Sequence, residues 1–274
     1  MNLEVILGKL KLKNPIILAS GTFDRSITEK IDVNKLGGLV TKTITLEPRQ
    51  GNPLPHIIKT KYGWLNSVGL KNVGLKKYLA DELAFWQHYQ TEIITSIAGK
   101  NTREYLILAK SLKTVAPSIE VDVSCPNTEN FGTDISKMAE ITRKVHQVFP
   151  GTIIVKLPPD IYGIIEIASA VLKAGADALT IANTYPGLEL IKAKPVFKKE
   201  IAGYSGGAIK PLTLGMVWHV SKKLKCPIIA SGGIENTQDV IDYLTFGAKA
   251  VQIGTANFLN PKISVKIIDE LQRR

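Results

Sequence analysis

An alternation of short apolar segments with amphipathic helical segments is the feature that most restricts how this chain can fold. β-Branched and other apolar residues concentrate at 15–19, 38–42, 92–97, 119–124, 152–157, 178–183, 227–230 and 250–253. Segments with a 3.6-residue apolar period, typical of helices that cover a sheet, lie at 103–114, 135–149, 162–174, 211–224 and 237–246. Strands that alternate with helices form parallel sheets, and eight such units fit a closed (β/α)8 barrel.

The length of the chain agrees with one barrel of this kind. It has 274 residues, and a (β/α)8 barrel typically needs about 250. Because no linker or change in composition divides the sequence, we predict a single α/β domain over 1–274, a TIM barrel. Segments 3–7 and 9–12 flank Gly8 and predict an N-terminal β-hairpin that closes one end. Two stretches without a helical period, 43–74 and 188–205, predict insertions over the rim, the second hairpin-like or lid-like.

Composition and charge exclude several classes of protein. Two cysteines make no disulfide framework, and no segment approaches the roughly 18 apolar residues of a spanning helix, so we expect a cytoplasmic protein. The net charge is +11, but the lysines are scattered and form no basic stripe studded with aromatic residues. We therefore expect a solvated surface that attracts small anions rather than nucleic acid. The four histidines are isolated, and no metal site is predicted.

Several residues that suit ligand binding stand where the predicted strands end. They are Ser20, Gly21, Lys42, Ala98, Gly99, Cys125, Lys156, Asn183, Gly232, Gly233, Gly254 and Thr255. In a barrel the carboxyl ends of all strands face one mouth. A buried ammonium group is costly unless an anion meets it, so Lys42 and Lys156 predict an anionic ligand.

Glycines near the last strands predict a phosphate site. Barrels commonly hold a phosphate after strands seven and eight, against helix N-termini, where this chain has the pairs Gly232-Gly233 and Gly254-Thr255. Gly206 and Gly207 would add a further backbone-amide contact. Together with the lysines, several asparagines and a thiol, this mouth fits flavin mononucleotide (FMN) beside a small anionic substrate.

Cys125 is the candidate for the chemistry. The strand pattern of 119–123 stops at Ser124, and Pro126 cannot join a β-ladder, so the thiol should lie on the rim of the barrel. Cysteine is more often a buried apolar residue, but the polar neighbours Ser124 and Asn127 favour a functional role here. Cys226 precedes a second proline and an apolar run, which indicates packing.

Ten motifs spread over nearly the whole chain resemble the class 1 dihydroorotate dehydrogenases. They are NPIILASG (14–21), TKTITLEPRQGNPLP (41–55), LNSVGLKNVG (65–74), SIAG (96–99), SCPN (124–127), VKLPPD (155–160), ANT (182–184), GGAIKP (206–211), SGGI (231–234) and IGTAN (253–257). The resemblance implies FMN-dependent oxidation of dihydroorotate to orotate in de novo pyrimidine (UMP) biosynthesis. It also implies that Cys125 is the general base that removes a proton from C5 while hydride leaves C6 for the flavin N5.

The same resemblance assigns residues to both ligands. Those implied for the substrate are Lys42, Asn66, Gly69, Leu70, Asn127, Asn183 and Thr184. Those implied for FMN are Ala19, Ser20, Gly21, Lys42, Thr43, Asp122, Lys156, Gly206, Gly232, Gly233, Gly254 and Thr255. Lys156 would lie near N1 and O2 of the flavin, where negative charge collects on reduction.

The chain departs from the family pattern at two places. The family usually has asparagine where this chain has Asp122, and the loop over 127–134 is shorter than usual. A carboxylate there loses an amide donor and repels an anionic substrate unless it is protonated or turned toward a lysine. We therefore expect Asp122 to weaken orotate binding.

The motifs FGTD (131–134) and EPRQGNP (47–53) look closest to the B-type catalytic subunit. That subunit works with a partner that carries FAD and an iron-sulfur cluster and passes electrons to NAD. This chain has neither a cysteine cluster nor a GxGxxG motif, so it would not hold those centres itself. We expect a homodimer, with a heterotetramer that includes the iron-sulfur FAD subunit, or a fumarate-reducing homodimer, as alternatives.

Two other functions stay open at this point. A flavin barrel that reduces uridine in tRNA would use a similar cysteine, but the sequence shows no separate basic helical segment after the barrel. A flavin-binding barrel without turnover is suggested by Asp122 and the short loop, whereas Cys125, Lys42 and Lys156 together favour an active enzyme.

Overall fold

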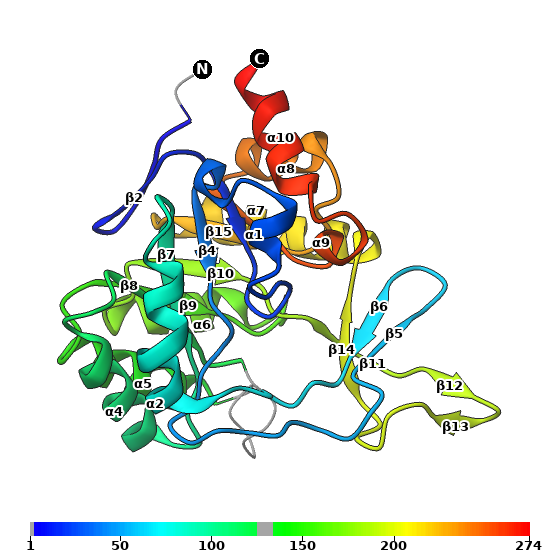
Figure 1. Ribbon diagram of the computed structural model, residues 1–274, viewed down its shortest axis with the longest axis horizontal. Coiled ribbons are helices and arrows are strands. Elements are labelled where there is room, and N and C mark those ends of the chain that lie inside the picture. Colours follow the sequence, from blue (N-terminus) through cyan, green and yellow to red (C-terminus); the bar gives the residue numbers. More distant parts are fainter. Residues whose placement is uncertain (1–2, 125–133) are drawn as a thin grey trace.

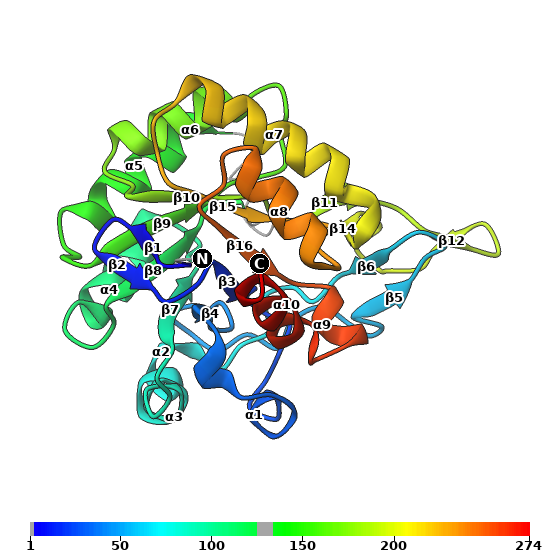
Figure 2. The ribbon, with the colours of Figure 1, turned by 90° about the horizontal axis from the view of Figure 1, so that it is seen from above.

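A closed barrel of parallel strands forms the centre of the molecule. The computed structural model describes residues 3–124 and 134–274. Its barrel strands are β3 (Ile16–Leu18), β4 (Gly38–Val40), β7 (Glu92–Ile97), β8 (Ser118–Asp122), β9 (Thr152–Lys156), β10 (Ala178–Ile181), β15 (Ile228–Ser231) and β16 (Ala250–Ile253). Each overlaps a segment predicted from the sequence, and the ladder closes between β16 and β3, so the TIM barrel is confirmed. Figure 2 shows helices surrounding the strands.

Amphipathic helices pack around the barrel. The longer ones are α4 (Thr102–Leu112), α5 (Ile135–His146), α6 (Ile164–Lys173), α7 (Lys210–Lys223), α8 (Thr237–Thr245) and α10 (Ile263–Gln272). Several begin at a side-chain cap, because an Asn or Asp oxygen accepts a hydrogen bond from an N–H of the first turn. Asp134, for example, caps α5 by accepting from the Lys137 N–H at 2.9 Å. Among the described residues, no helix is long and apolar enough to cross a membrane.

Shorter helices complete the ring, and one of them has no signal in the sequence pattern. They are α1 (Ile27–Lys30), η1 (Val33–Lys35), α2 (Gly74–Lys77), η2 (Tyr78–Glu82), α3 (Leu83–Trp86), η3 (Gly207–Ile209) and α9 (Ala256–Leu259). The run from α2 to α3 is continuous, but its middle section, η2, is a π-helix. A π-helical turn shifts the 3.6-residue spacing of apolar residues, which hides this helix from a periodicity search.

The predicted N-terminal hairpin is present and closes the barrel opposite the ligand end. Strand β1 (Val5–Leu7) pairs antiparallel with β2 (Leu10–Leu12). Three leucines of this hairpin are buried together with residues at the amino ends of the barrel strands, among them Ala178 and Ala250. The hairpin therefore serves as an apolar plug.

The two predicted insertions pair with each other. Strands β5 (Ile57–Lys59) and β6 (Trp64–Asn66) come from the first insertion, and β14 (Ala202–Ser205) comes from the second. With β11 (Tyr185–Gly187) they form a four-stranded sheet in the order β11-β14-β6-β5. A further hairpin, β12 (Leu190–Ile191) with β13 (Lys194–Pro195), extends from it. Figure 1 shows this sheet standing out beside the barrel.

Candidate active site

A single cavity of about 810 Å³ collects the ligand residues expected from the sequence. It lies at the carboxyl ends of the barrel strands and is bordered by the small sheet. Its lining includes Ala19, Ser20, Gly21, Lys42, Thr43, Asn66, Gly69, Leu70, Asp122, Lys156, Asn183, Thr184, Gly206, Gly232, Gly233, Gly254 and Thr255. Cys125 and Asn127 lie outside the described residues, and Ser124, directly before Cys125, lines the cavity.

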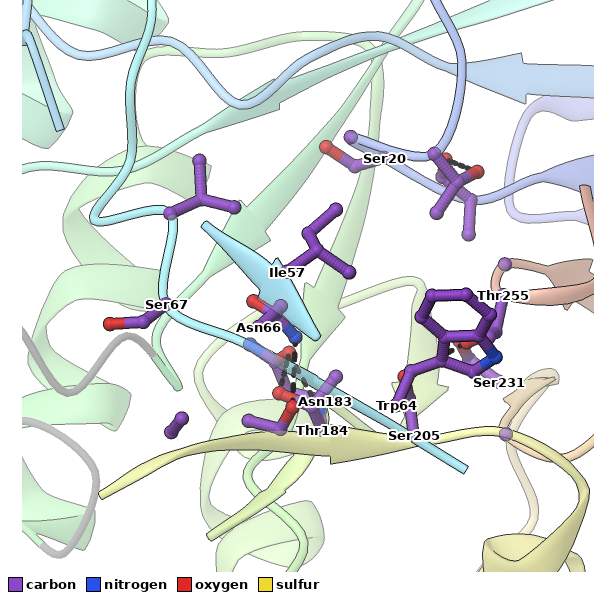
Figure 3. Close-up of a pocket in the computed structure, with 18 of the residues that line it drawn as sticks. Ser20, Ile57, Trp64, Asn66, Ser67, Asn183, Thr184, Ser205, Ser231 and Thr255 are labelled. Carbon is purple, nitrogen blue, oxygen red and sulfur yellow. Dashed lines mark hydrogen bonds between the residues drawn. The ribbon is translucent and has the colours of Figure 1, made fainter. Parts of the chain in front are cut away.

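The two sides of the cavity carry different chemical groups. Figure 3 shows Asn66, Asn183 and Thr184 gathered at one side, whereas Trp64 and Thr255 lie at the other. The first side is rich in amide groups, and the second leads to the glycines that follow the last two barrel strands. Such a cavity has room for a large ligand and a small one side by side.

The glycine side has a backbone shape that side chains would obstruct. Gly232 and Gly233 have φ values of +155° and +66°. A Cβ added to Gly232 would lie 2.5 Å from Thr213 Oγ1, and one added to Gly233 would lie 2.5 Å from the Lys210 backbone nitrogen. Gly206 also has a positive φ, of +110°. These positions require glycine because of the tight backbone packing, and a cavity wall formed by glycines fits a phosphate group, because an anion can approach their amide groups closely.

Gly207 does not take the role expected from the sequence. Its N–H donates a hydrogen bond to Glu235 Oε1 at 3.0 Å, and a Cβ added to it would lie 2.6 Å from Glu235 Oε2. The expected amide contact is therefore wrong for Gly207, because a carboxylate of the chain already binds that N–H. Glu235 was not foreseen, since the SGGI motif ends one residue before it.

Ser20 uses its hydroxyl group in hydrogen bonds to other residues of the chain. Its Oγ donates to the Thr41 carbonyl oxygen at 2.8 Å and accepts from the Thr43 N–H at 3.1 Å. Thr43 Oγ1 lies 3.0 Å from the same oxygen and so donates to it, which leaves Thr43 to accept from Ser96 Oγ at 2.9 Å. A hydroxyl has one hydrogen, so Ser20 offers no side-chain donor to a ligand. Its contacts with a flavin would come from the backbone and Cβ.

Lys42 extends from a strand end into the cavity, where its side chain remains exposed to solvent while the cavity walls partly desolvate it. Its Nζ lies against Gly21, where an added Cβ would come within 2.9 Å of it. Burial, and secondly repulsion by the charge of Lys156, lower the pKa of Lys42 from its ordinary value. An anionic group of a ligand would offset both effects.

Lys156 already has an anionic neighbour inside the barrel. Its Nζ lies 3.9 Å from Oε1 of Glu120, a residue with no exposed surface. Glu120 is an anionic neighbour that the sequence reasoning did not foresee, and the expectation that Lys156 also meets a ligand stays a prediction. A signal for Glu120 was present in the sequence, because Glu120, Asp122 and Ser124 alternate along one strand and share the face that points into the barrel.

Asp122 is tied to the residue before Cys125. It is 6% exposed, and its Oδ1 accepts from both the N–H and the hydroxyl of Ser124, at 3.1 and 2.6 Å. Ser124 Oγ in turn accepts from Asn183 Nδ2 at 2.7 Å. Asn183 Oδ1 accepts from the Thr184 N–H at 2.8 Å. Asp122 is thus turned toward Ser124.

The remaining strand-end pair and the second cysteine do not contribute to the cavity. Ala98 and Gly99 are absent from its lining, and an added Cβ at Gly99 would contact Glu104 and Tyr105 of α4. Burial raises the pKa of Cys226 to about 11, so this thiol is a poor base near neutral pH. Within the described residues, no group of three or more His, Cys, Asp or Glu side chains could hold a metal ion.

A glycine-lined cavity at the carboxyl ends of the strands is typical of (β/α)8-barrel enzymes. The sequence profile described as "Dihydroorotate dehydrogenase" matches residues 2–274. The chain belongs to the dihydroorotate dehydrogenase family. Members of this family generally use a flavin.

Three similar proteins carry the name "Dihydroorotate dehydrogenase B (NAD(+)), catalytic subunit". The protein of Thermoanaerobacter pseudethanolicus is 42% identical over 282 residues, which cover 100% of this chain and 93% of that protein. That of Caldicellulosiruptor bescii is 42% identical over 280 residues, 99% of this chain and 93% of its own length. That of Bacillus pumilus is 43% identical over 279 residues, 98% and 90% respectively. The resemblance to the B-type catalytic subunit is thereby confirmed.

Proposed function

We propose that this chain catalyses the FMN-dependent oxidation of dihydroorotate to orotate in de novo pyrimidine biosynthesis. One observation carries the proposal: all described residues that the family resemblance assigns to substrate and flavin line the same cavity. They come from positions between Ala19 and Thr255, so their convergence depends on the closed barrel. The proposal includes one FMN-binding barrel domain over residues 1–274.

The amide side of the cavity would hold the substrate. Gly69 and Leu70 have φ values of +70° and +56°, and a left-handed leucine is uncommon away from functional sites. An added Cβ at Gly69 would lie 2.5 Å from Asn52 Oδ1, so the turn is packed tightly against its neighbour. We assign the backbone of this turn and the ammonium of Lys42 to the substrate carboxylate. We assign the ring amides of the substrate to Asn66, Asn127, Asn183 and Thr184.

Asn183 would act as a donor toward the substrate. One hydrogen of its Nδ2 is used by Ser124, and its Oδ1 is used by Thr184. The second Nδ2 hydrogen is therefore the group that Asn183 can offer to a carbonyl oxygen of a ligand. Asn66 Nδ2 donates to the Gly203 carbonyl oxygen at 3.0 Å, which leaves one hydrogen of that amide too.

The glycine side and the strand ends fit FMN. Gly206, Gly232, Gly233, Gly254 and Thr255 would hold its phosphate, and Ala19, Ser20, Gly21, Thr43, Asp122 and Lys156 would contact the ring. Bound there, FMN supplies the acceptor for the hydride that leaves C6 of the substrate. The ammonium of Lys156 would favour the reduced, more negative state of the ring over the oxidised one.

Cys125 is assigned as the general base that takes the proton from C5. A thiol does this as thiolate, and the positive charges of Lys42 and Lys156 would favour that form. The Asp122–Ser124 hydrogen bonds fix the backbone immediately before Cys125. The proton would thus pass to Cys125 Sγ.

The electron acceptor follows from the subclass. The similar proteins are named catalytic subunits of an NAD(+) enzyme, which implies a second, electron-transferring subunit. We propose that such a subunit, carrying FAD and an iron-sulfur cluster, passes electrons from this chain to NAD. The homodimer stays a prediction.

Orotate formation with a soluble electron acceptor tests the proposed activity. We expect turnover of dihydroorotate by the parent protein and loss of at least about a hundredfold in Cys125→Ala, as for removal of a general base. Cys226→Ala is the matched control, because its thiol lies outside the cavity lining, and it should retain the parent rate. Equal rates in the parent and Cys125→Ala would contradict the assignment of the base.

A further inference from the structure

A charged side chain lies in the barrel core where apolar layers are usual. Glu120, on β8, is fully buried. Its Oε2 accepts hydrogen bonds from Thr180 Oγ1 at 2.8 Å and from Gln252 Nε2 at 2.5 Å. These contacts join Glu120 to β10 and β16 across the barrel interior.

The contacts of Glu120 suit the ionised carboxylate. Both groups that meet Oε2, the Thr180 hydroxyl and the Gln252 amide, are donors, as an ionised carboxylate requires. Among residues 3–124 and 134–274, Oε1 has no hydrogen-bond partner, and its ion-pair partner is the Lys156 ammonium at 3.9 Å. A protonated Oε1 would point a donor at a cation.

The position of Glu120 separates it from direct contact with a ligand. Lys156 and Gln252 line the cavity, whereas Glu120 does not. The carboxylate therefore lies beneath these two side chains, and any effect on a ligand passes through them. Salt screens the Glu120 carboxylate little at this depth, so the carboxylate reduces the positive potential that Lys156 creates in the cavity above.

The charge of Glu120 decides how positive the cavity is. Lys42 and Lys156 repel each other, and this repulsion contributes to the lowered pKa of Lys42. Glu120 offsets one of the two positive charges from below. Without it, Lys156 would lose the one carboxylate within ion-pair distance of its ammonium group in the described part of the chain.

We propose that Glu120 is a positioning residue that pairs with Lys156 and limits the positive charge Lys156 presents to the cavity, and thereby sets the relative affinity of the site for reduced and oxidised flavin. The pairing stands on the contacts alone. The consequence for flavin rests on the proposed function.

The pairing is tested in the protein freed of cofactor by thermal unfolding of Lys156→Met, Glu120→Gln and the double variant. Lys156→Met leaves a buried, unpaired carboxylate, which is strongly destabilising. We expect its Tm to fall by at least about 5 °C, and the double variant to regain most of that loss. A double variant no more stable than Lys156→Met would overturn the proposal. This readout does not depend on the ligand.

The effect on the cavity is tested by the dissociation constants of oxidised and dithionite-reduced FMN for the parent and Glu120→Gln. Removing the carboxylate leaves Lys156 uncompensated, so the preference for reduced FMN should increase about tenfold. Thr180→Val removes a hydrogen bond to Glu120 but keeps its charge, so this control should retain the parent ratio. Equal losses of both affinities in Glu120→Gln would show a purely structural role and contradict the proposal.

The two measurements distinguish failure of this proposal from failure of the proposed function. The double variant could recover stability while Glu120→Gln keeps the parent ratio of dissociation constants for oxidised and reduced FMN. The pair would then be structural, and its proposed effect on flavin affinity would be wrong. If the double variant recovers stability but neither FMN form binds, the proposed function fails together with the flavin role, and the Glu120–Lys156 pairing stands.

Discussion

The Asp122 carboxylate holds the Ser124 hydroxyl by a hydrogen bond of 2.6 Å. An ionised carboxylate only accepts, so Ser124 must give its hydrogen to Asp122 and can only accept from Asn183 Nδ2. The direction of each hydrogen bond in this chain is therefore fixed. Asp122 thereby determines which end of the Asn183 amide faces Ser124.

Replacement of Asp122 by asparagine should strengthen orotate binding. The carboxylate lies in the cavity lining and carries the same sign of charge as orotate, so its removal relieves repulsion. We expect about a tenfold lower dissociation constant for Asp122→Asn at neutral pH, measured by titration calorimetry. Asp269→Asn, at an exposed ion pair, is the control for net charge. Equal orotate affinities in the parent and Asp122→Asn would refute the expectation.

Removal of the Ser124 hydroxyl should destabilise the protein. Ser124→Ala leaves the buried Asp122 Oδ1 with one donor fewer and removes the acceptor of Asn183 Nδ2. Loss of such partners lowers the free energy of unfolding by about 1–3 kcal/mol, measured by urea denaturation. Ser26→Ala, at a partly exposed serine that bonds an exposed aspartate, should cost about 0.5 kcal/mol or less. Similar losses in both variants would argue against a special role for Ser124.

Lys42 should give the protein without ligand a distinctive stability profile at alkaline pH. Burial, and secondly the charge of Lys156, lower the pKa of Lys42 below its ordinary value of 10.5. Between the lowered and the ordinary pKa the unfolded chain binds more protons, so Lys42 makes stability rise with pH there. Lys42→Met should remove this contribution, seen as a flatter or more falling curve of Tm against pH on the alkaline side below pH 10.5.

Lys59→Met, at an exposed position on β5, is the control for that experiment. Its curve of Tm against pH should match that of the parent. If orotate binds the Lys42 ammonium as we propose, its affinity for the parent should weaken over the same pH range. Parallel Tm curves for the parent and Lys42→Met would contradict this role of Lys42.

Two glycines of the phosphate side should respond differently to alanine. Gly233 has a φ of +66°, and its added Cβ would lie 2.5 Å from a backbone atom, so Gly233→Ala should lower the Tm by several degrees. An added Cβ at Gly254 meets nothing closer than 3.6 Å, so Gly254→Ala should keep the parent Tm. A lower FMN affinity in the stable Gly254→Ala variant would then report on the phosphate contact itself. Equal Tm losses would contradict the difference in packing.

The barrel could be predicted because its signals are local. Each strand is a short apolar run, as at 152–157, and each helix has its own apolar period. The pairing of the two insertions could not be predicted, because Leu65 and Tyr204 are far apart in the sequence and their strands are short. The helix over 74–86 was hidden by its π-helical turn.

The candidate site was predictable where residues follow strand ends and unpredictable where partners come from within the barrel. Lys42 and Lys156 are visible as cations at strand ends. Their environments differ, because Glu120 compensates Lys156 from below and Lys42 has a lowered pKa. Which N–H groups a phosphate can reach also depends on side-chain placement, as Glu235 shows at Gly207.

The proposed activity requires that one cavity binds dihydroorotate and a flavin together, with Cys125 as the general base. Anaerobic mixing of the purified, flavin-loaded protein with dihydroorotate tests it most directly, with the visible flavin absorbance as the readout. We expect prompt bleaching in the parent and in Cys226→Ala, and none on the same timescale in Cys125→Ala. A parent protein that binds flavin, and whose flavin stays oxidised when dihydroorotate is added, would contradict the proposed activity.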